Sequence, residues 1–194
     1  EHSGKSKERN LQTKETLEAN TAAIKAQLEK YIDLSDPAKG VLVSNYEWLG
    51  SLSMIDFLRD YGKYFSINYM LSKEIVKSRL EEGISFTEFS YQILQSIDFY
   101  HLHHVQGVSM QIGGNDQWGN LTSGLELIRK IDGLEEEAEV MTAKLLLRSD
   151  GKKFGKSESG ALFLDPKLTS PYAIYQYFMN VPDDAAIRLM KVFS

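Results

Sequence analysis

The sequence of 194 residues contains no cysteine, which excludes a disulfide framework, a thiolate metal site and a thiol nucleophile. No apolar run approaches the roughly 20 residues that a membrane-spanning helix needs. The N-terminus also lacks the hydrophobic stretch of a signal peptide. These absences favour a reducing, cytosol-like compartment. We therefore expect a cytoplasmic protein with no membrane partner, with an organelle as the alternative location.

An excess of basic residues is missing as well. The sequence has 22 lysines and arginines against 27 aspartates and glutamates, and its formal net charge is −5. Nucleic-acid binding through a bulk basic character is therefore excluded, whereas a local basic patch is not. What is present is the composition of a soluble globular protein, with 42% hydrophobic and 25% charged residues. The length suffices for one core, or for one core and a fragment of another.

The hydrophobic pattern alternates between helical and extended segments. Apolar residues recur at three- and four-residue steps from Thr87 to Leu102, which predicts an amphipathic helix, and another helix is expected from Thr13 to Tyr31. Residues 41–43 and 145–147 are typical of buried strands, and residues 108–112 alternate as a strand does. Further helices are predicted over residues 54–59, over residues 72–80 and from Pro171 onward. Strands that alternate with helices favour an α/β fold with helical additions.

A glycine pair ends the alternating strand. Gly113 and Gly114 are followed by Asn115 and Asp116, which are good N-cap residues for the next helix. A nucleotide can approach the backbone at such a pair, and the helix amides beyond it offer donors. The carboxylate of Asp116 suits ribose hydroxyls because it accepts two hydrogen bonds. On these residues alone, an ordinary glycine turn before a capped helix is the commoner explanation.

Cationic residues gather in two segments. Lys153 and Lys156, with Ser157 beside them, belong to a basic loop that can close over a triphosphate and neutralise charge on a leaving pyrophosphate. Lys5 and Arg9 form a similar, weaker pattern near the N-terminus. A bare charge run is more often a solvated turn, so the pattern by itself leaves both explanations open.

Three polar residues share one face of the helix predicted from Thr87 to Leu102. Tyr91, Gln95 and Asp98 are spaced i, i+4, i+7. A hydroxyl, an amide and a carboxylate that point into one pocket can bind a ligand with an ammonium and a phenol. An edge position with water-satisfied polar groups explains the spacing equally well.

Three histidines, His101, His103 and His104, were considered as metal ligands. No carboxylate or cysteine stands at matching spacing, so we expect partly buried or surface histidines and no metal site.

Two blocks make the sequence recognisable. Residues 111–120 (QIGGNDQWGN) and residues 153–157 (KFGKS) together resemble the bacterial-type tyrosyl-tRNA synthetases, which are class I aminoacyl-tRNA synthetases. The second block corresponds to the KMSKS signature of that class. Residues 57–60, 83–91 and 164–172 match as well, so the resemblance covers nearly the whole chain. It implies a Rossmann-like catalytic domain with a parallel sheet and helices, followed by the start of an α-helical domain.

The same resemblance implies a domain division. Residues 1–145 would be part of the nucleotide-binding catalytic domain with a helical insertion, residues 146–170 the KMSKS-type loop and linker, and residues 171–194 the start of the helical anticodon-side domain. The chain then looks like an internal piece of a longer synthetase, without the HIGH segment that contacts ATP and without the C-terminal RNA-binding domain. We expect this piece alone to make no tyrosyl-adenylate.

The resemblance also implies the reaction and its residues. Tyrosine would be activated by ATP, with Mg²⁺ expected, and transferred to tRNA(Tyr) by a homodimer with Phe86 at its interface. The family's catalytic positions match Lys5, Arg9, Lys153, Lys156 and Ser157. Its tyrosine-binding positions match Asn45, Tyr91, Gln95, Asp98, Gln111 and Gln117. Its ATP-binding positions match Gly114, Asp116, Leu145, Leu146 and Lys156.

Two alternatives to this function stay open. A tryptophanyl-type synthetase shares the glycine and KMSKS-like blocks, but Tyr91, Gln95 and Asp98 favour tyrosine. A non-catalytic RNA-binding relative of the fold is the second alternative, and intact Lys156 and Asp116 argue against it.

In the reaction that the resemblance implies, the substrate carboxylate is itself the nucleophile, so catalysis would consist of positioning and charge stabilisation.

Overall fold

The computed structural model describes residues 12–73, 76–77, 80, 83–145 and 162–193. The chain divides into two compact units, of which the first contains Val43–Lys144 and the second contains Leu11–Leu42 and Leu145–Ser194. The domain boundaries after residues 145 and 170 that the resemblance implies stay predictions.

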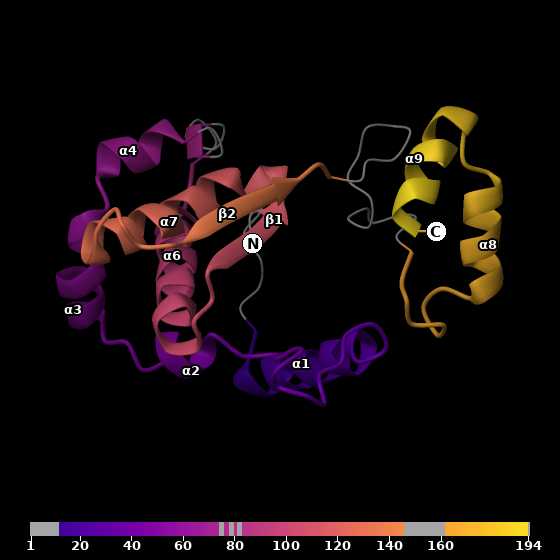
Figure 1. The fold of residues 1–194 in the computed structure, drawn as a ribbon, viewed down its shortest axis with the longest axis horizontal. Helices are drawn as coiled ribbons and strands as arrows, with labels where there is room; N and C mark the ends of the chain where they lie inside the picture. Colours follow the sequence, from indigo (N-terminus) through magenta and orange to yellow (C-terminus); the bar gives the residue numbers. More distant parts are fainter. Residues whose placement is uncertain (1–11, 74–75, 78–79, 81–82, 146–161, 194) are drawn as a thin grey trace. The chain divides into compact units, whose positions relative to one another are not determined.

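Two long helices form the centre of the first unit (Figure 1). Helix α6 (Phe86–Gln106) begins at a capping box of Ser85 with Glu88 and ends at Gly107, whose positive φ of 68° suits glycine. The helix predicted from Thr87 to Leu102 is thus confirmed and extends one turn further. Helix α7 (Trp118–Asp132) packs along it.

Close packing of α6 on α7 depends on a small residue at their contact. A Cβ atom added to Gly124 of α7 would lie 3.1 Å from Cδ1 of Phe99 on α6. Both Phe99 and Ile128 are completely buried there, with Ala138 against them. A neighbouring apolar cluster joins Ile93 and Ile97 of α6 to Leu127 of α7 and to Met70. These contacts fix α6, the helix that carries the predicted tyrosine pocket.

A parallel pair of strands covers the same two helices. Strand β1 (Met110–Gly114) pairs in parallel with β2 (Glu139–Ala143), with Met110 opposite Glu139 and Gly114 opposite Ala143. Helix α7 makes the crossover between them, as parallel strands require. This β–α–β unit with flanking helices confirms the predicted α/β class.

Short helices precede α6 in the first unit. They are α2 (Tyr46–Leu49), α3 (Met54–Asp56), a π-helical segment (Phe57–Tyr61), a 3₁₀ turn (Gly62–Tyr64) and α4 (Ile67–Ser72). The predicted helical region over residues 54–59 corresponds to α3 and the π-helical segment that follows it.

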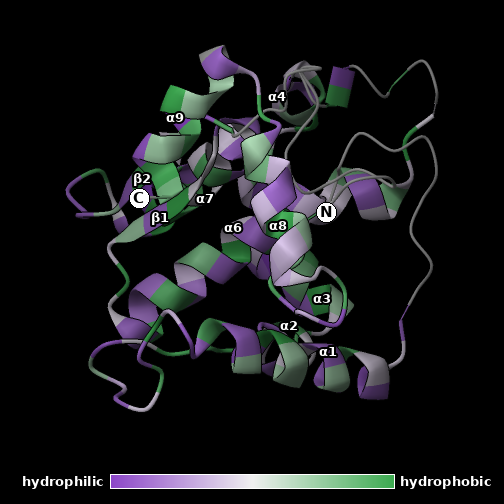
Figure 2. Cartoon of the chain, turned by 90° about the vertical axis from the view of Figure 1, so that its right-hand side faces the viewer, coloured by the Kyte–Doolittle hydropathy of each residue, from purple (hydrophilic) through white to green (hydrophobic). Residues whose placement is uncertain are grey.

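The second unit contains three helices among its described residues: α1 (Lys14–Leu28), α8 (Pro171–Met179) and α9 (Asp183–Phe193). Thr13 caps α1 and Ser170 caps α8, which has Pro171 in its first turn as predicted. Apolar and polar residues alternate along α1 (Figure 2). No residue of α1 is buried, whereas Ala185 and Leu189 of α9 are.

One of the predicted strands needs correction. Residues 41–43 form no strand; their side chains are exposed, and within the described part of the chain no strand pairs with them. A β-branched run therefore stays irregular where it lacks a partner. The second strand of the sheet is Glu139–Ala143, and Leu145 lies beyond its end. Residues 146 and 147 lie outside the described residues, so the strand over residues 145–147 stays a prediction.

The predicted N-cap of α7 is also different. Asn115 and Asp116 belong to a 3₁₀ turn (Asn115–Gln117), and the N-cap position is Gln117, whose side chain makes no capping bond. Both glycines of the pair belong to β1 itself. The strand thus ends two residues later than predicted, at Gly114 instead of Ile112, because its pairing with β2 continues to Gly114.

Candidate functional site

The carboxylate of Asp98, on α6, is held by two donors from the neighbourhood of α2. Asn45 Nδ2 donates to Asp98 Oδ2 at 2.9 Å, and Trp48 Nε1 donates to Asp98 Oδ1 at 2.7 Å. Asn45 is the N-cap residue of α2 but makes no capping bond. Trp48 lies one turn further along α2, so both side chains reach α6 from one side of that short helix.

Asp98 is half-buried, and burial raises the pKa of its carboxyl above the usual value. The hydrogen bonds from Asn45 and Trp48 and the charge of His101 act in the opposite direction on that pKa. An ionised carboxylate has about four acceptor positions, and the donors above fill one on each oxygen. Counted over the described residues alone, acceptor positions therefore remain for a donor from a ligand, such as a phenol.

The predicted trio lies on one continuous helix. Tyr91, Gln95 and Asp98 are all half-buried residues of α6, one turn apart in sequence. The helix therefore presents a hydroxyl, an amide and a carboxylate along one face, as the spacing predicted. Beside them, Gln92 is buried, and its Nε2 has no hydrogen-bond partner among the described residues.

Two more glutamines lie within β1 and just before α7. Gln111 belongs to β1, and its Oε1 is a buried acceptor with no partner in the described part of the chain. Gln117 accepts a bond from Asn120 Nδ2 at 3.2 Å through its Oε1. A Cβ added to Gly113 would lie 3.1 Å from Cβ of Gln117, so glycine allows β1 to approach α7 here. A buried acceptor without a donor fits a site completed by a ligand.

Two of the nucleotide-binding residues implied by the resemblance, Gly114 and Asp116, lie near the carboxyl edge of the sheet. Gly114 is the last residue of β1, and Asp116 is half-buried in the turn that follows. Leu145 comes two residues after β2. The carboxyl ends of parallel strands meet at one edge, which is where open α/β sheets bind ligands. The remaining implied residues, Lys5, Arg9, Leu146, Lys153, Lys156 and Ser157, lie outside the described residues.

The histidines at the end of α6 have ordinary partners. His103 Nδ1 lies 2.8 Å from the carbonyl oxygen of Val108, and His103 Nε2 lies 3.1 Å from Glu136 Oε1. His104 Nε2 lies 2.8 Å from Asp132 Oδ2. In the described ranges, no three histidine, aspartate or glutamate side chains gather as metal ligands.

No described helix has the length and apolar character to cross a membrane.

Trp48 and His101 were not identified from the sequence as parts of this site. Trp48 bonds Asp98 directly, and the ring of His101 stacks on Trp48. Two spacings carry a signal: Trp48 follows Asn45 by three residues, and His101 follows Asp98 by three, which places each pair on one helical face.

Comparison with known proteins gives a consistent result. The family model for class I tRNA synthetases (W and Y) matches residues 1–194. Tyrosine–tRNA ligase 1 of Streptococcus thermophilus is 53% identical over 191 residues, which are 98% of this chain and 45% of that protein. Tyrosine–tRNA ligase 2 of Bacillus cereus is 52% identical over 192 residues, 99% of this chain and 46% of that protein. The chain thus spans about half the length of these curated relatives.

Solved structures agree with the sequence relatives. A C-terminally truncated mitochondrial tyrosyl-tRNA synthetase from Aspergillus nidulans has a TM-score of 0.71 and 29% identity, over 98% of this chain and 57% of that one. The corresponding truncated protein from Coccidioides posadasii has a TM-score of 0.64 and 31% identity, over 77% of this chain and 44% of that one.

Proposed function

Because the chain belongs to the class I tRNA synthetases of the tryptophan and tyrosine group, we propose that it is part of a tyrosine–tRNA ligase. The reaction would join tyrosine to ATP as tyrosyl-adenylate and then transfer the amino acid to tRNA(Tyr). The observation that supports tyrosine is the half-buried Asp98, which Asn45 and Trp48 hold and which, among the described residues, keeps acceptor positions for a further donor. The phenol of tyrosine can supply that donor, and the ring of phenylalanine cannot.

The helix face beside Asp98 supports a full binding mode for the amino acid. In this proposal Asp98 accepts the phenolic hydrogen, and Gln95 and Tyr91, about one and two turns away, bind the ammonium group. Gln111 and Gln117 bind near the carboxylate of the substrate. Selectivity against phenylalanine follows, because a buried acceptor left without its donor costs roughly 1–3 kcal/mol or more.

The chemistry itself needs no protein nucleophile. The carboxylate oxygen of tyrosine attacks the α-phosphorus of ATP, an O–P bond forms, and the bond to pyrophosphate breaks. Gly114 and Asp116 would bind the ribose, and Leu145 with Leu146 the adenine. Charge on the departing pyrophosphate would be neutralised by the cationic residues Lys5, Arg9, Lys153 and Lys156, with Ser157 as a hydroxyl donor. Mg²⁺ would enter with ATP as part of the substrate.

A second copy of the chain is the proposed protein partner, besides tRNA. Apolar side chains of the first unit are exposed around α3, α4 and the start of α6, and Phe86 is 68% exposed. The others are Met54, Ile55, Leu58 and Ile67. An exposed apolar group of this kind is typical of a subunit interface. We expect the assembly to act in the cytoplasm.

The test of this function is ATP–pyrophosphate exchange by the full-length protein that contains these residues. Exchange should depend on tyrosine and should be far weaker with phenylalanine or tryptophan. Tryptophan-dependent exchange would make it a tryptophanyl enzyme. Binding of tRNA without any exchange would make it a non-catalytic relative.

A further inference from the structure

The imidazole of His101 stacks flat on the indole of Trp48. Their ring centroids are 4.3 Å apart, and the ring planes differ by only 12°. The same indole donates its Nε1 hydrogen to Asp98 at 2.7 Å. Trp48 is therefore fixed twice by α6, at its edge through Asp98 and on its face through His101.

The stack supplies what the hydrogen bond alone cannot. A single hydrogen bond fixes the position of one indole atom, but small rotations about the two side-chain torsions of Trp48 can still tilt the ring. Contact with a second flat ring sets the plane of the indole, and so the direction of its N–H group. That direction decides which acceptor position on Asp98 the indole fills and which positions stay available to a ligand.

We propose that His101 is a positioning residue for amino-acid selection, which acts through Trp48 to orient the carboxylate of Asp98 toward the phenol of the substrate. This inference rests on the proposed function, because it requires that Asp98 receive the phenol. His101 does not touch the substrate in this role. The hydrogen bonds from Asn45 and Trp48 allow several orientations of the Asp98 carboxylate. The stack of His101 on Trp48 selects one of them.

The neighbouring His104 has different contacts and cannot take this role. His104 lies three residues later on the same helix and pairs with Asp132 of α7. Its other ring contacts are with Tyr100 and His103, away from Trp48. Replacement of His104 therefore removes a histidine from the same helix, together with its contact to Asp132, and leaves the stack of His101 on Trp48 in place. It is a matched control.

The experiment compares His101→Ala, His101→Phe and His104→Ala in the full-length protein. Equilibrium dialysis gives the Kd for tyrosine, and pyrophosphate exchange gives kcat/KM for tyrosine and phenylalanine and the KM for ATP. Loss of an aromatic pair corresponds to a change of about 2- to 10-fold. We expect His101→Ala to raise the Kd for tyrosine by that factor. The ratio of kcat/KM for tyrosine to kcat/KM for phenylalanine should fall by the same factor, and the KM for ATP should stay unchanged.

The other two variants separate positioning from general packing. His101→Phe keeps a flat ring against the indole and should recover most of the lost selectivity. His104→Ala should keep the wild-type ratio. A spectroscopic signature accompanies these results: the indole N–H signal of Trp48, assigned by its loss in Trp48→Phe, should shift in His101→Ala and stay in place in His104→Ala.

Three results would overturn the role of His101. One is a His101→Ala variant in which kcat/KM is unchanged for both amino acids, and another is an equal fall in kcat/KM for tyrosine and phenylalanine, since both leave the ratio at its wild-type value. The third is a His101→Phe variant that behaves like the alanine variant. Failure of the proposed function looks different, because wild-type protein would then bind no tyrosine at all, and both ideas would be lost together.

Discussion

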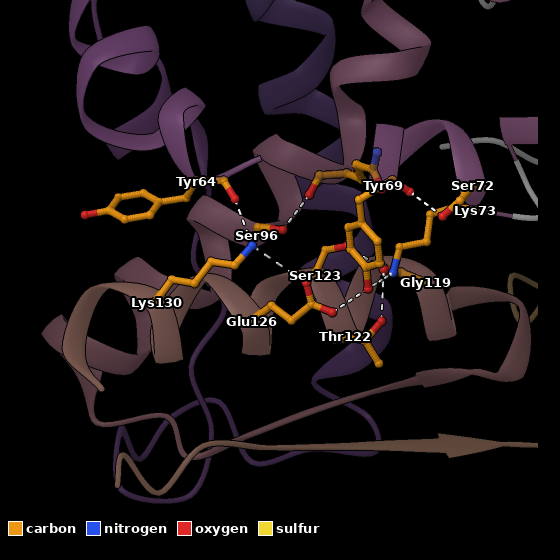
Figure 3. Close-up of polar contacts among 11 residues, drawn as sticks. Tyr64, Tyr69, Ser72, Lys73, Ser96, Gly119, Thr122, Ser123, Glu126 and Lys130 are labelled. Carbon is orange, nitrogen blue, oxygen red and sulfur yellow. Dashed lines mark hydrogen bonds and ion pairs between the residues drawn. The ribbon is translucent and has the colours of Figure 1, made fainter. Parts of the chain in front are cut away.

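Two polar clusters join helices in the first unit, and they differ in what surrounds the carboxylate of each. One gathers around the half-buried Asp98, between α2 and α6. The other gathers around the exposed Tyr69, between α4 and α7 (Figure 3). Both use hydrogen bonds of similar length, so length does not distinguish them. The charge nearby does: Asp98 is held by two neutral donors, whereas the carboxylate of Glu126 has the ammonium group of Lys130 beside it.

The surface cluster combines a phenol, a carboxylate and two lysines. Tyr69 donates its hydroxyl hydrogen to Glu126 Oε1 at 2.5 Å and accepts a bond from Lys73 Nζ at 2.7 Å. The bond to Glu126 is the main reason that the pKa of Tyr69 rises to about 12. Lys130 Nζ lies 4.0 Å from Glu126 Oε2 and donates to the carbonyl oxygen of Tyr64. These groups connect helices at the surface, whereas Asp98 is half-buried and held by neutral donors.

The largest effect should come from breaking the cluster around Asp98. In Asp98→Asn the side chain loses its charge, and its new NH₂ donor faces one of the two donors, from Asn45 or Trp48, that bond to the two carboxylate oxygens. A hydrogen bond to a charged group contributes about 1.5–3 kcal/mol. We expect kcat/KM for tyrosine to fall by roughly 10- to 100-fold, with a narrower tyrosine-over-phenylalanine ratio. Exchange kinetics with both amino acids measure it.

A thermal melt is the control for this substitution. If Asp98→Asn melts like the wild type and still keeps the wild-type ratio, the phenol has another partner. The choice of tyrosine would then depend on similarity to the relatives alone.

A smaller effect is expected from the pH dependence of tyrosine binding. The phenol needs an ionised acceptor, and burial raises the pKa of Asp98. Binding should therefore weaken as pH falls, beginning at a higher pH than for an ordinary aspartate. Asn45→Ala removes a bond that lowers this pKa, so the loss should begin at a still higher pH. Dialysis from about pH 8 to about pH 4 measures both curves; coincident curves would show that Asn45 does not tune the acceptor.

The sequence predicted the part of this site that lies on one helix. Tyr91, Gln95 and Asp98 share α6, and a helix converts spacing directly into a shared face. Trp48 reaches Asp98 across 50 residues of chain, and no periodicity encodes such a contact. The stack of His101 on Trp48 was missed for the same reason. Contacts between helices need the tertiary fold.

The error over residues 41–43 has a related cause. Residues 41–43 have the composition of a strand, but composition cannot supply the neighbour that a strand pairs with. The partner of β1 is Glu139–Ala143, where alternate residues are half-buried. No strand was predicted there, because Glu139 and Thr142 interrupt its apolar residues.

A weaker effect should follow from breaking the surface cluster. Tyr69→Phe removes the hydroxyl that joins Lys73 to Glu126 and keeps the ring. Exposed polar contacts contribute about 1 kcal/mol or less. We expect a loss of that size in the free energy of unfolding by urea, with an unchanged Kd for tyrosine. A changed Kd would mean that this cluster also takes part in binding, which would remove the contrast between the two.

The smallest expected quantity is the coupling between the clusters. Substitutions that share no partners usually add within about 0.5 kcal/mol, whereas groups in one hydrogen-bond network couple by roughly 0.5–3 kcal/mol. Asn45→Ala and Asp98→Asn remove two ends of the same bond, so their effects on tyrosine binding should fall short of additive. Tyr69→Phe combined with Asp98→Asn should show no coupling, because no bond joins the two clusters in the described residues. Two double-mutant cycles on the Kd for tyrosine measure this. Coupling between Tyr69 and Asp98 as large as that between Asn45 and Asp98 would mean that α4, α6 and α7 respond to the ligand as one body, and the surface cluster would then belong to the binding site.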